Sequence, residues 1–162
     1  MITLKFGGTS MGSARRIIDS AAIMIGRAKE ERISVVVSAV AGISNKLQES
    51  IDKAVEGATA AEFVTAIKTT HQTICTEINQ SLPAFDTKDV LAQLEPVFAE
   101  YERLLTAVSA FGECPTSVHC RIMGIGEQLS APIVAAVLKA QDQTVCLLDS
   151  RKYIFTTGNQ AE

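Results

Sequence analysis

Residues 5–10, with the sequence KFGGTS, place a lysine, two glycines and two hydroxyls in one short stretch. The glycines have no Cβ, so the backbone can turn sharply there and approach a ligand closely. Thr9 and Ser10 add hydroxyls and amide N–H groups beside the positive end of a following helix, which favours anions. Lys5 supplies a mobile positive charge for a phosphate oxygen. This stretch predicts an anion site; the alternative is a plain strand-to-helix turn with a solvated lysine.

A second stretch of small and polar residues is SAVAGISN, at residues 38–45. Its small side chains allow a ligand to approach, and Ser38 and Ser44 can donate hydrogen bonds to a carboxylate or a phosphate. The alternative is a loop that leads into the next helix, with Ser44 as the N-cap of that helix.

A third stretch, residues 123–131 (MGIGEQLSA), reads as part of a helix. Gly124 and Gly126 each cost a plain helix about 1 kcal/mol relative to alanine, so a close approach of backbone or ligand is a reason for them to be there. Glu127 could accept hydrogen bonds from an ammonium group, although an isolated glutamate usually faces solvent.

The remaining reactive side chains predict no further site. His71 has no partner His or Cys at ligand spacing and is expected to be a surface or structural histidine, and His119 is expected to serve packing rather than catalysis. Arg15 and Arg16 are expected to be solvated, with a phosphate contact as the alternative. The four cysteines form no C-x-x-C pair and are expected to be reduced thiols; they are Cys75, Cys114, Cys120 and Cys146.

Composition indicates a globular domain and excludes several classes of protein. The chain has 162 residues, 47% hydrophobic and 20% charged, which is enough for a real core and argues against disorder. A net charge of -3 gives no basic footprint for nucleic acid. No signal or transit peptide is visible, and no apolar run has the length of a membrane span, so a cytoplasmic protein is expected.

Hydrophobic periodicity predicts alternating strands and helices at the start of the chain and a helical region after it. The expected strands are residues 2–6, 33–37, 144–148 and 153–157, and the expected helices are residues 12–31, 45–57, 60–78, 86–111 with Pro96 as a kink or a new start, and 116–139. The run 33–37 is typical of a parallel strand covered on both faces. A strand–helix–strand order places residues 5–10 and 38–45 side by side at the carboxyl edge of the sheet.

The three stretches together resemble the aspartate kinases, within the amino acid kinase family. Residues 5–10, 38–45 and 126–131 carry the likeness, and residues 132–136 and 147–157 continue it. The resemblance implies an α/β three-layer sandwich with a mostly parallel central sheet and a helical insertion. Because complete family members are much longer, residues 1–162 would be the N-terminal, amino-acid-substrate side of the kinase domain. The nucleotide-binding half and the ACT regulatory domains would be absent from this truncated chain.

The resemblance also implies an activity, the transfer of the γ-phosphoryl group of ATP, with Mg²⁺, to the β-carboxylate of L-aspartate. The product, 4-phospho-L-aspartate, leads to lysine, threonine and methionine. Lys5 would be the catalytic residue. The phosphates of ATP would be bound by Lys5, Gly7, Gly8, Thr9, Ser10 and Ser38, and L-aspartate by Ser38, Ala39, Ser44 and Glu127. No residue is expected to hold a metal directly, and a homo-oligomer is expected, with no nucleic-acid or membrane partner.

Two alternatives remain at this stage. The chain could belong to another amino acid kinase branch, acting on glutamate, acetylglutamate or carbamate. It could also be a non-catalytic binding or assembly module that contributes only packing. If the chain is a fragment, we expect it to be inactive or nearly so by itself, and the exposed sheet edge to favour self-association.

Overall fold

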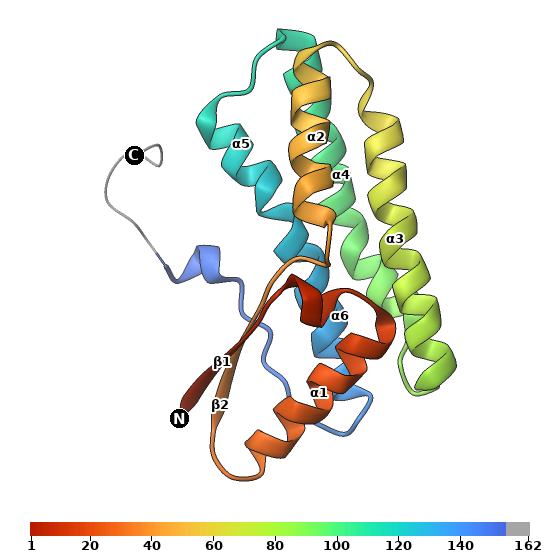
Figure 1. Ribbon diagram of the computed structural model, residues 1–162, viewed down its shortest axis with the longest axis vertical. Helices are drawn as coiled ribbons and strands as arrows, with labels where there is room; N and C mark the ends of the chain where they lie inside the picture. Colours follow the sequence, from red (N-terminus) through yellow and green to blue (C-terminus); the bar gives the residue numbers. More distant parts are fainter. Residues whose placement is uncertain (155–162) are drawn as a thin grey trace.

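The computed structural model describes residues 1–154, which are mostly helical with a small parallel sheet (Figure 1). The elements in chain order are β1 (Ile2–Phe6), the 3-10 turn η1 (Gly8–Met11), α1 (Ala14–Ala28), β2 (Ile33–Val37), α2 (Ile43–Val55), α3 (Ala60–Ser81), α4 (Thr87–Phe111), α5 (Thr116–Met123), α6 (Ile125–Lys139) and the 3-10 turn η2 (Ser150–Lys152). The expected strands and helices over residues 2–139 are therefore confirmed in type and order.

The two strands pair in parallel, with Ile2 opposite Ile33 and Phe6 opposite Val37. The crossover between them is α1, as the strand–helix–strand pattern predicts. Both strands alternate between half-buried and exposed residues, and Val36 is 49% exposed. The expectation that residues 33–37 are covered on both faces is therefore wrong for the described chain. Helices α1 and α6 contact β2, and they cover only one face of this two-stranded sheet.

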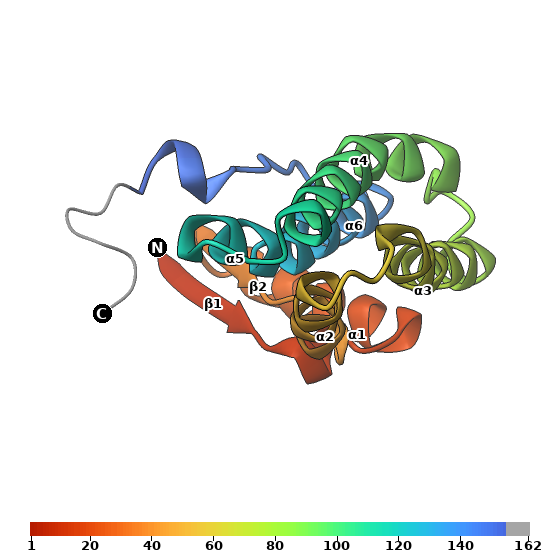
Figure 2. The ribbon, with the colours of Figure 1, turned by 90° about the horizontal axis from the view of Figure 1, so that it is seen from above.

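The helices form an elongated bundle beside the sheet. α4 contacts α2, α3 and α6, and α6 also contacts α1, so α6 connects the sheet end to the bundle (Figures 1 and 2). Fully buried side chains from several helices fill the interior, among them Ile17, Leu47, Ile67, Leu105 and Ile122. α4 continues through Pro96 as one helix, so Pro96 does not mark a new start.

Helix starts follow capping chemistry at two positions. Ser13 caps α1 by accepting a hydrogen bond from the amide of Arg16, and Asp86 caps α4 in the same way. The alternative in which Ser44 caps the helix after β2 is wrong, because that helix begins earlier. Gly42 occupies the N-cap with φ of 81°, a left-handed conformation that glycine adopts without strain, and Ser44 lies inside the first turn.

The end of the chain differs from expectation. Residues 144–148 are not a strand; they have no regular secondary structure, and Leu147 and Leu148 are 47% and 63% exposed. A strand needs a partner for its backbone groups, and within the described residues the sheet consists of β1 and β2 alone. Of the expected fourth strand, Tyr153 and Ile154 follow η2 without strand structure, and residues 155–157 lie outside the described residues.

One helical segment is longer and more apolar than predicted from the sequence. Thr116–Lys139, which comprises α5 and α6, is long and apolar enough to cross a membrane by length and composition. The expectation that no run reaches that length is therefore wrong. Half of the most apolar part of this segment is buried inside the protein, and α6 packs against α1 and α4. Its composition is thus accounted for as that of a core helix.

Candidate functional site

The loops that follow β1 and β2 lie side by side. The amide of Ser38 donates a 3.0 Å hydrogen bond to the carbonyl oxygen of Phe6, which extends the parallel pairing by one step beyond the strands. A Cβ on Gly8 would stand 3.3 Å from the carbonyl oxygen of Ala39, tighter than most real Cβ contacts. The adjacency predicted for residues 5–10 and 38–45 is confirmed, and at Gly8 the two backbones leave little room for a side chain.

Lys5 is exposed at the end of β1, beside the glycine turn. A Cβ on Gly7 would lie 3.7 Å from the Lys5 ammonium nitrogen, so this side chain passes close to the turn. The amide of Ser10 bonds to the carbonyl of Gly7 at 3.0 Å, which closes the 3-10 turn η1. Among the described residues Lys5 forms no ion pair. The ammonium group is therefore free to meet an anionic ligand.

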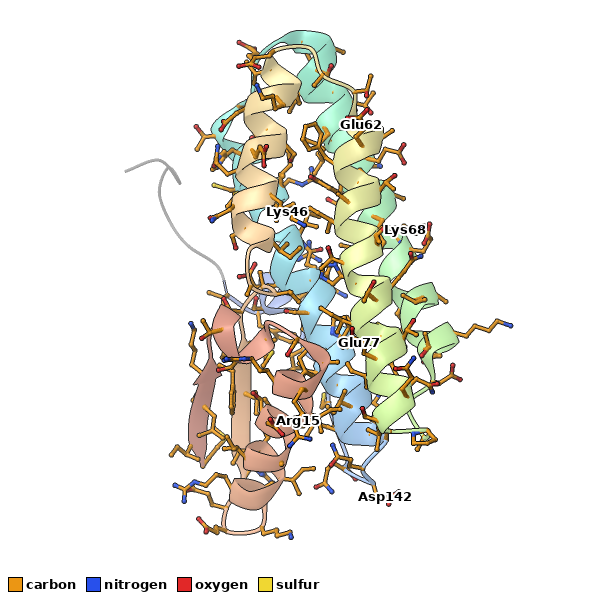
Figure 3. The ribbon with its side chains drawn as sticks, turned by 45° about the vertical axis from the view of Figure 1, so that its right-hand side comes forward. Arg15, Lys46, Glu62, Lys68, Glu77 and Asp142 are labelled. Atoms are coloured by element: carbon orange, nitrogen blue, oxygen red, sulfur yellow. The ribbon has the colours of Figure 1, made fainter. Side chains whose placement is uncertain are left out.

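Two side chains of α1 donate hydrogen bonds to the backbone of the loop after β1. Arg16 donates a 3.2 Å hydrogen bond to the carbonyl oxygen of Thr9, and the hydroxyl of Ser20 donates one of 3.2 Å to the carbonyl oxygen of Ser10. Arg15 instead pairs with Asp19 on the exposed surface of α1, where Figure 3 shows it. Arg16 thus has a backbone partner, whereas Arg15 has only a neighbour on its own helix.

The third stretch meets the second loop at the start of α6. Glu127 accepts a 3.2 Å hydrogen bond at Oε1 from the amide of Ala39, 88 residues earlier in the chain. Ser130, one turn further along α6, donates a 2.8 Å hydrogen bond to the carbonyl oxygen of Ser38. Glu127 therefore does not simply face solvent: one carboxylate oxygen contacts the loop after β2, although the residue as a whole stays exposed.

Gly124 and Gly126, the two glycines of residues 123–131, have different structural roles. A Cβ on Gly126 would stand 2.5 Å from the Cβ of Ala39, a distance that real Cβ atoms do not show, so the expected close backbone approach is confirmed there. Gly124 has only ordinary contacts, and it separates α5 from α6 as the C-cap of one and the N-cap of the other. Gly126 lets α6 and the loop touch, whereas Gly124 marks a helix boundary.

The expected residues are not all brought together. Ser44 lies on the exposed side of the first turn of α2, and no hydrogen bond within residues 1–154 joins its hydroxyl to the other site residues. Ser130 was not anticipated, although its position three residues after Glu127 puts both on one face of a helix. That spacing was the available signal.

Both histidines have structural partners away from this site. His71 is fully buried between α3 and α4, and its Nδ1 lies 2.8 Å from the carbonyl oxygen of Ile67. Burial lowers the pKa of His71 below its usual value. Nε2 of His119 lies 2.8 Å from Oε1 of Gln48 and joins α5 to α2. In the described part of the chain, no group of three or more His, Cys, Asp or Glu residues is arranged to hold a metal.

The sequence matches the amino acid kinase family over residues 1–162. The chain belongs to the amino acid kinase family. The aspartokinase of Chlamydia trachomatis is 31% identical over 156 residues, which cover 96% of this chain and 32% of that protein. The bifunctional aspartokinase/homoserine dehydrogenase of Haemophilus influenzae is 30% identical over 166 residues, which cover 100% of this chain and 20% of that protein. This kinase-family chain therefore spans a third or less of the length of these curated relatives.

Solved structures of Escherichia coli aspartokinase III have a similar fold. The T-state structure, in complex with lysine and aspartate, gives a TM-score of 0.71 at 24% identity and covers 89% of this chain and 30% of that chain. The R-state structure, in complex with aspartate and ADP, gives a TM-score of 0.70 at 24% identity and covers 88% and 29%. At this identity the likeness establishes the fold of the kinase-family chain.

Proposed function

We propose that this chain forms the amino-acid-binding side of an aspartate kinase, which transfers the γ-phosphoryl group of ATP to the β-carboxylate of L-aspartate. The names of the relatives and the aspartate and ADP bound to Escherichia coli aspartokinase III support the proposal. The observation that carries it is that the loops after β1 and β2 and the start of α6 meet at the 38–39 backbone.

Each polar group at this junction has a role in the proposed reaction. Glu127 binds the α-ammonium of aspartate and so sets the orientation of the substrate. Ser38 donates a hydrogen bond to the substrate and Ala39 lines the site, while Ser44, outside the junction on the exposed first turn of α2, would donate a second hydrogen bond to the bound substrate. The β-carboxylate is already ionised near neutral pH, so no general base is needed. One of its oxygens attacks the γ-phosphorus as the bond to ADP breaks, which makes this reaction chiefly a matter of alignment and charge.

The loop after β1 has the chemistry to hold the nucleotide phosphates. Gly7 and Gly8 keep the loop free of side chains, and Thr9 and Ser10 offer N–H groups and hydroxyls. Lys5 neutralises negative charge as it moves between the donor and acceptor oxygens. Mg²⁺ would enter with ATP, as a partner of the nucleotide phosphates. When bound, Mg²⁺ would share in neutralising those phosphates.

The proposal extends to the domain and its surroundings. Residues 1–162 would be the N-terminal part of the kinase domain, with the nucleotide-binding half and the ACT domains in other segments. In the complete domain, β1 and β2 would belong to a mostly parallel central sheet between helical layers, a three-layer sandwich. The half-exposed Val36 on β2 supports this, because further layers would cover it. We further propose a cytoplasmic homo-oligomer that serves lysine, threonine and methionine synthesis.

The test is ATP-dependent acyl phosphate formation from L-aspartate, trapped with hydroxylamine, by the protein that carries this chain. Lys5→Ala and Glu127→Ala should each lower kcat/KM by about 100-fold or more, the size of effect seen when one transition-state contact is removed. Glu62→Ala, on the exposed surface of α3 (Figure 3), is the matched control and should leave the rate unchanged. Faster turnover of glutamate, acetylglutamate or carbamate than of aspartate would assign the chain to another branch of the family.

A further inference from the structure

One peptide group in the site is held at both ends by a single helix. The peptide that joins Ser38 to Ala39 has one carbonyl and one N–H. The carbonyl accepts from the Ser130 hydroxyl at 2.8 Å, and the N–H donates to Oε1 of Glu127 at 3.2 Å. Glu127 and Ser130 are three residues apart on α6 and so lie on one face of it. Both polar groups of this peptide are therefore bonded to side chains of the same helix turn.

Packing at this peptide leaves little freedom for another arrangement. Ser130 is fully buried and Ala39 is 2% exposed, so bulk water does not replace the hydroxyl. Gly126 lies against the Cβ of Ala39, which fixes the separation between α6 and the loop. If the peptide rotated by half a turn, the Ser38 carbonyl oxygen would point at the Glu127 carboxylate. Two oxygens that carry negative charge repel each other, so the Ser130 bond selects the orientation that serves Glu127.

We propose that Ser130 is a positioning residue for the amino-acid substrate. By holding the Ser38 carbonyl, Ser130 presents the Ala39 N–H to Glu127, and that N–H orients the carboxylate toward the substrate ammonium. This inference rests on the proposed function, because it takes Glu127 to bind the ammonium group. Ala39 also has a role in this arrangement. Its N–H donates to Oε1 of Glu127, so that Oε2 of the same carboxylate remains for the substrate ammonium.

The kinetic consequence is selective. Ser130→Ala removes one neutral hydrogen bond, so the KM for L-aspartate should rise about five- to tenfold, while the KM for ATP stays unchanged. Ser130→Thr keeps the hydroxyl and should restore most of the loss. Ser50→Ala is the matched control, since Ser50 is also fully buried and donates to a backbone carbonyl, that of Leu47, elsewhere in the fold. A Ser130→Ala variant with equal changes in both KM values would overturn the positioning role.

A direct readout is the amide signal of Ala39 in protein labelled with [15N]alanine. Because this amide donates to Oε1 of Glu127, its proton signal should move upfield in Glu127→Gln, in which a neutral amide replaces the charged acceptor. In Ser130→Ala, the amide proton should move upfield, as expected for a weaker hydrogen bond, whereas Ser50→Ala should not move it. An Ala39 signal that stays in place in Glu127→Gln overturns the inference even if Ser130→Ala does not fold.

The outcomes separate this inference from the function on which it rests. If the Ala39 signal responds to Glu127 and Ser130 but L-aspartate neither shifts it nor is phosphorylated, the peptide arrangement stands and the aspartate role is overturned. If aspartate is phosphorylated and Ser130→Ala changes neither its KM nor the Ala39 signal, the function stands and Ser130 has no positioning role.

Discussion

The Tyr101 hydroxyl in α4 donates a 2.7 Å hydrogen bond to Oγ of Ser50 in α2. Ser50 in turn donates to the carbonyl oxygen of Leu47 at 2.7 Å. Tyr101 and Ser50 are both fully buried, and burial raises the pKa of Tyr101 to about 12, so the phenol stays protonated as a donor. This pair therefore joins α2 to the long helix α4 inside the helical bundle.

Replacing either partner of this buried pair should cost stability, but unequally. Ser50→Ala leaves the Tyr101 hydroxyl buried without an acceptor, which costs about 1–3 kcal/mol of unfolding free energy. Tyr101→Phe removes the donor while Ser50 keeps its bond to Leu47, so its cost should be about 0.5–1.5 kcal/mol. The double variant should cost less than the two single changes added together. Urea denaturation measures all three, and a larger loss for Tyr101→Phe than for Ser50→Ala would contradict this account.

Gly126→Ala should destabilise the protein, although alanine normally favours a helix over glycine. The new Cβ would overlap the Cβ of Ala39 and push the loop away from α6, at a cost of about 1–3 kcal/mol. Gly26→Ala in α1 is the matched control, because nothing lies within 4 Å of its added Cβ and a gain of about 0.5–1 kcal/mol is expected. Opposite signs for the two changes in chemical denaturation support the close contact; a stabilising Gly126→Ala would rule it out.

The helices and the parallel strand pair could be predicted because their signals are local. Apolar residues recur at helical spacing along α1, and Ser13 and Asp86 cap helices as their types suggest. The adjacency of the two loops also followed, since parallel strands bring their carboxyl ends to one edge. The start of α2 could not be predicted from the sequence. Its N-cap is Gly42 in a left-handed conformation, whereas Ser44 nearby is a more usual N-cap residue.

The errors came from features that depend on distant parts of the molecule. Residues 144–148 have the β-branched and apolar composition of a strand, but strand formation needs a partner edge that their own sequence does not encode. The coverage of β2 likewise depends on which other layers are present. The spacing of Ser130 from Glu127 indicates a shared helix face, but the partner of its hydroxyl, the Ser38 carbonyl 92 residues away, is not encoded in the local sequence.

The four cysteines should differ sharply in reactivity toward iodoacetamide. Cys75 is fully buried, and burial raises the pKa of its thiol to about 11, so very little thiolate is present at pH 8. Cys120 and Cys146 are exposed and should react first, with the half-buried Cys114 more slowly, because burial also raises the pKa of its thiol. Peptide mass spectrometry gives the rate at each site. Labelling of Cys75 as fast as Cys120 in the folded protein would contradict this order, whereas both should react readily in denaturant.

His71 is buried in its neutral form. Desolvation is the largest cause of its lowered pKa; the nearby charge of Lys46, at the start of α2 (Figure 3), also lowers it, and the bond to the Ile67 carbonyl opposes both. Its ring meets the Phe98 ring edge-on, with centroids 6.1 Å apart, and within the described residues Nε2 has no hydrogen-bond partner. Lys68, on the same helix as His71, forms an ion pair with Glu95 of α4, in which Nζ lies 2.7 Å from Oε1.

Mild acid should therefore destabilise the fold through His71. The unfolded chain takes up a proton near pH 6.5, the ordinary pKa of histidine, but the folded chain resists it, so the contribution is fully present above that pH and is lost as the pH falls below it. Between pH 7.5 and 5.5 the unmodified protein should lose about 1 kcal/mol more unfolding free energy than His71→Leu, in which the site cannot titrate. Urea midpoints at the two pH values measure the difference. Equal losses in both proteins would mean that His71 can be protonated inside the fold at little cost, which its burial argues against.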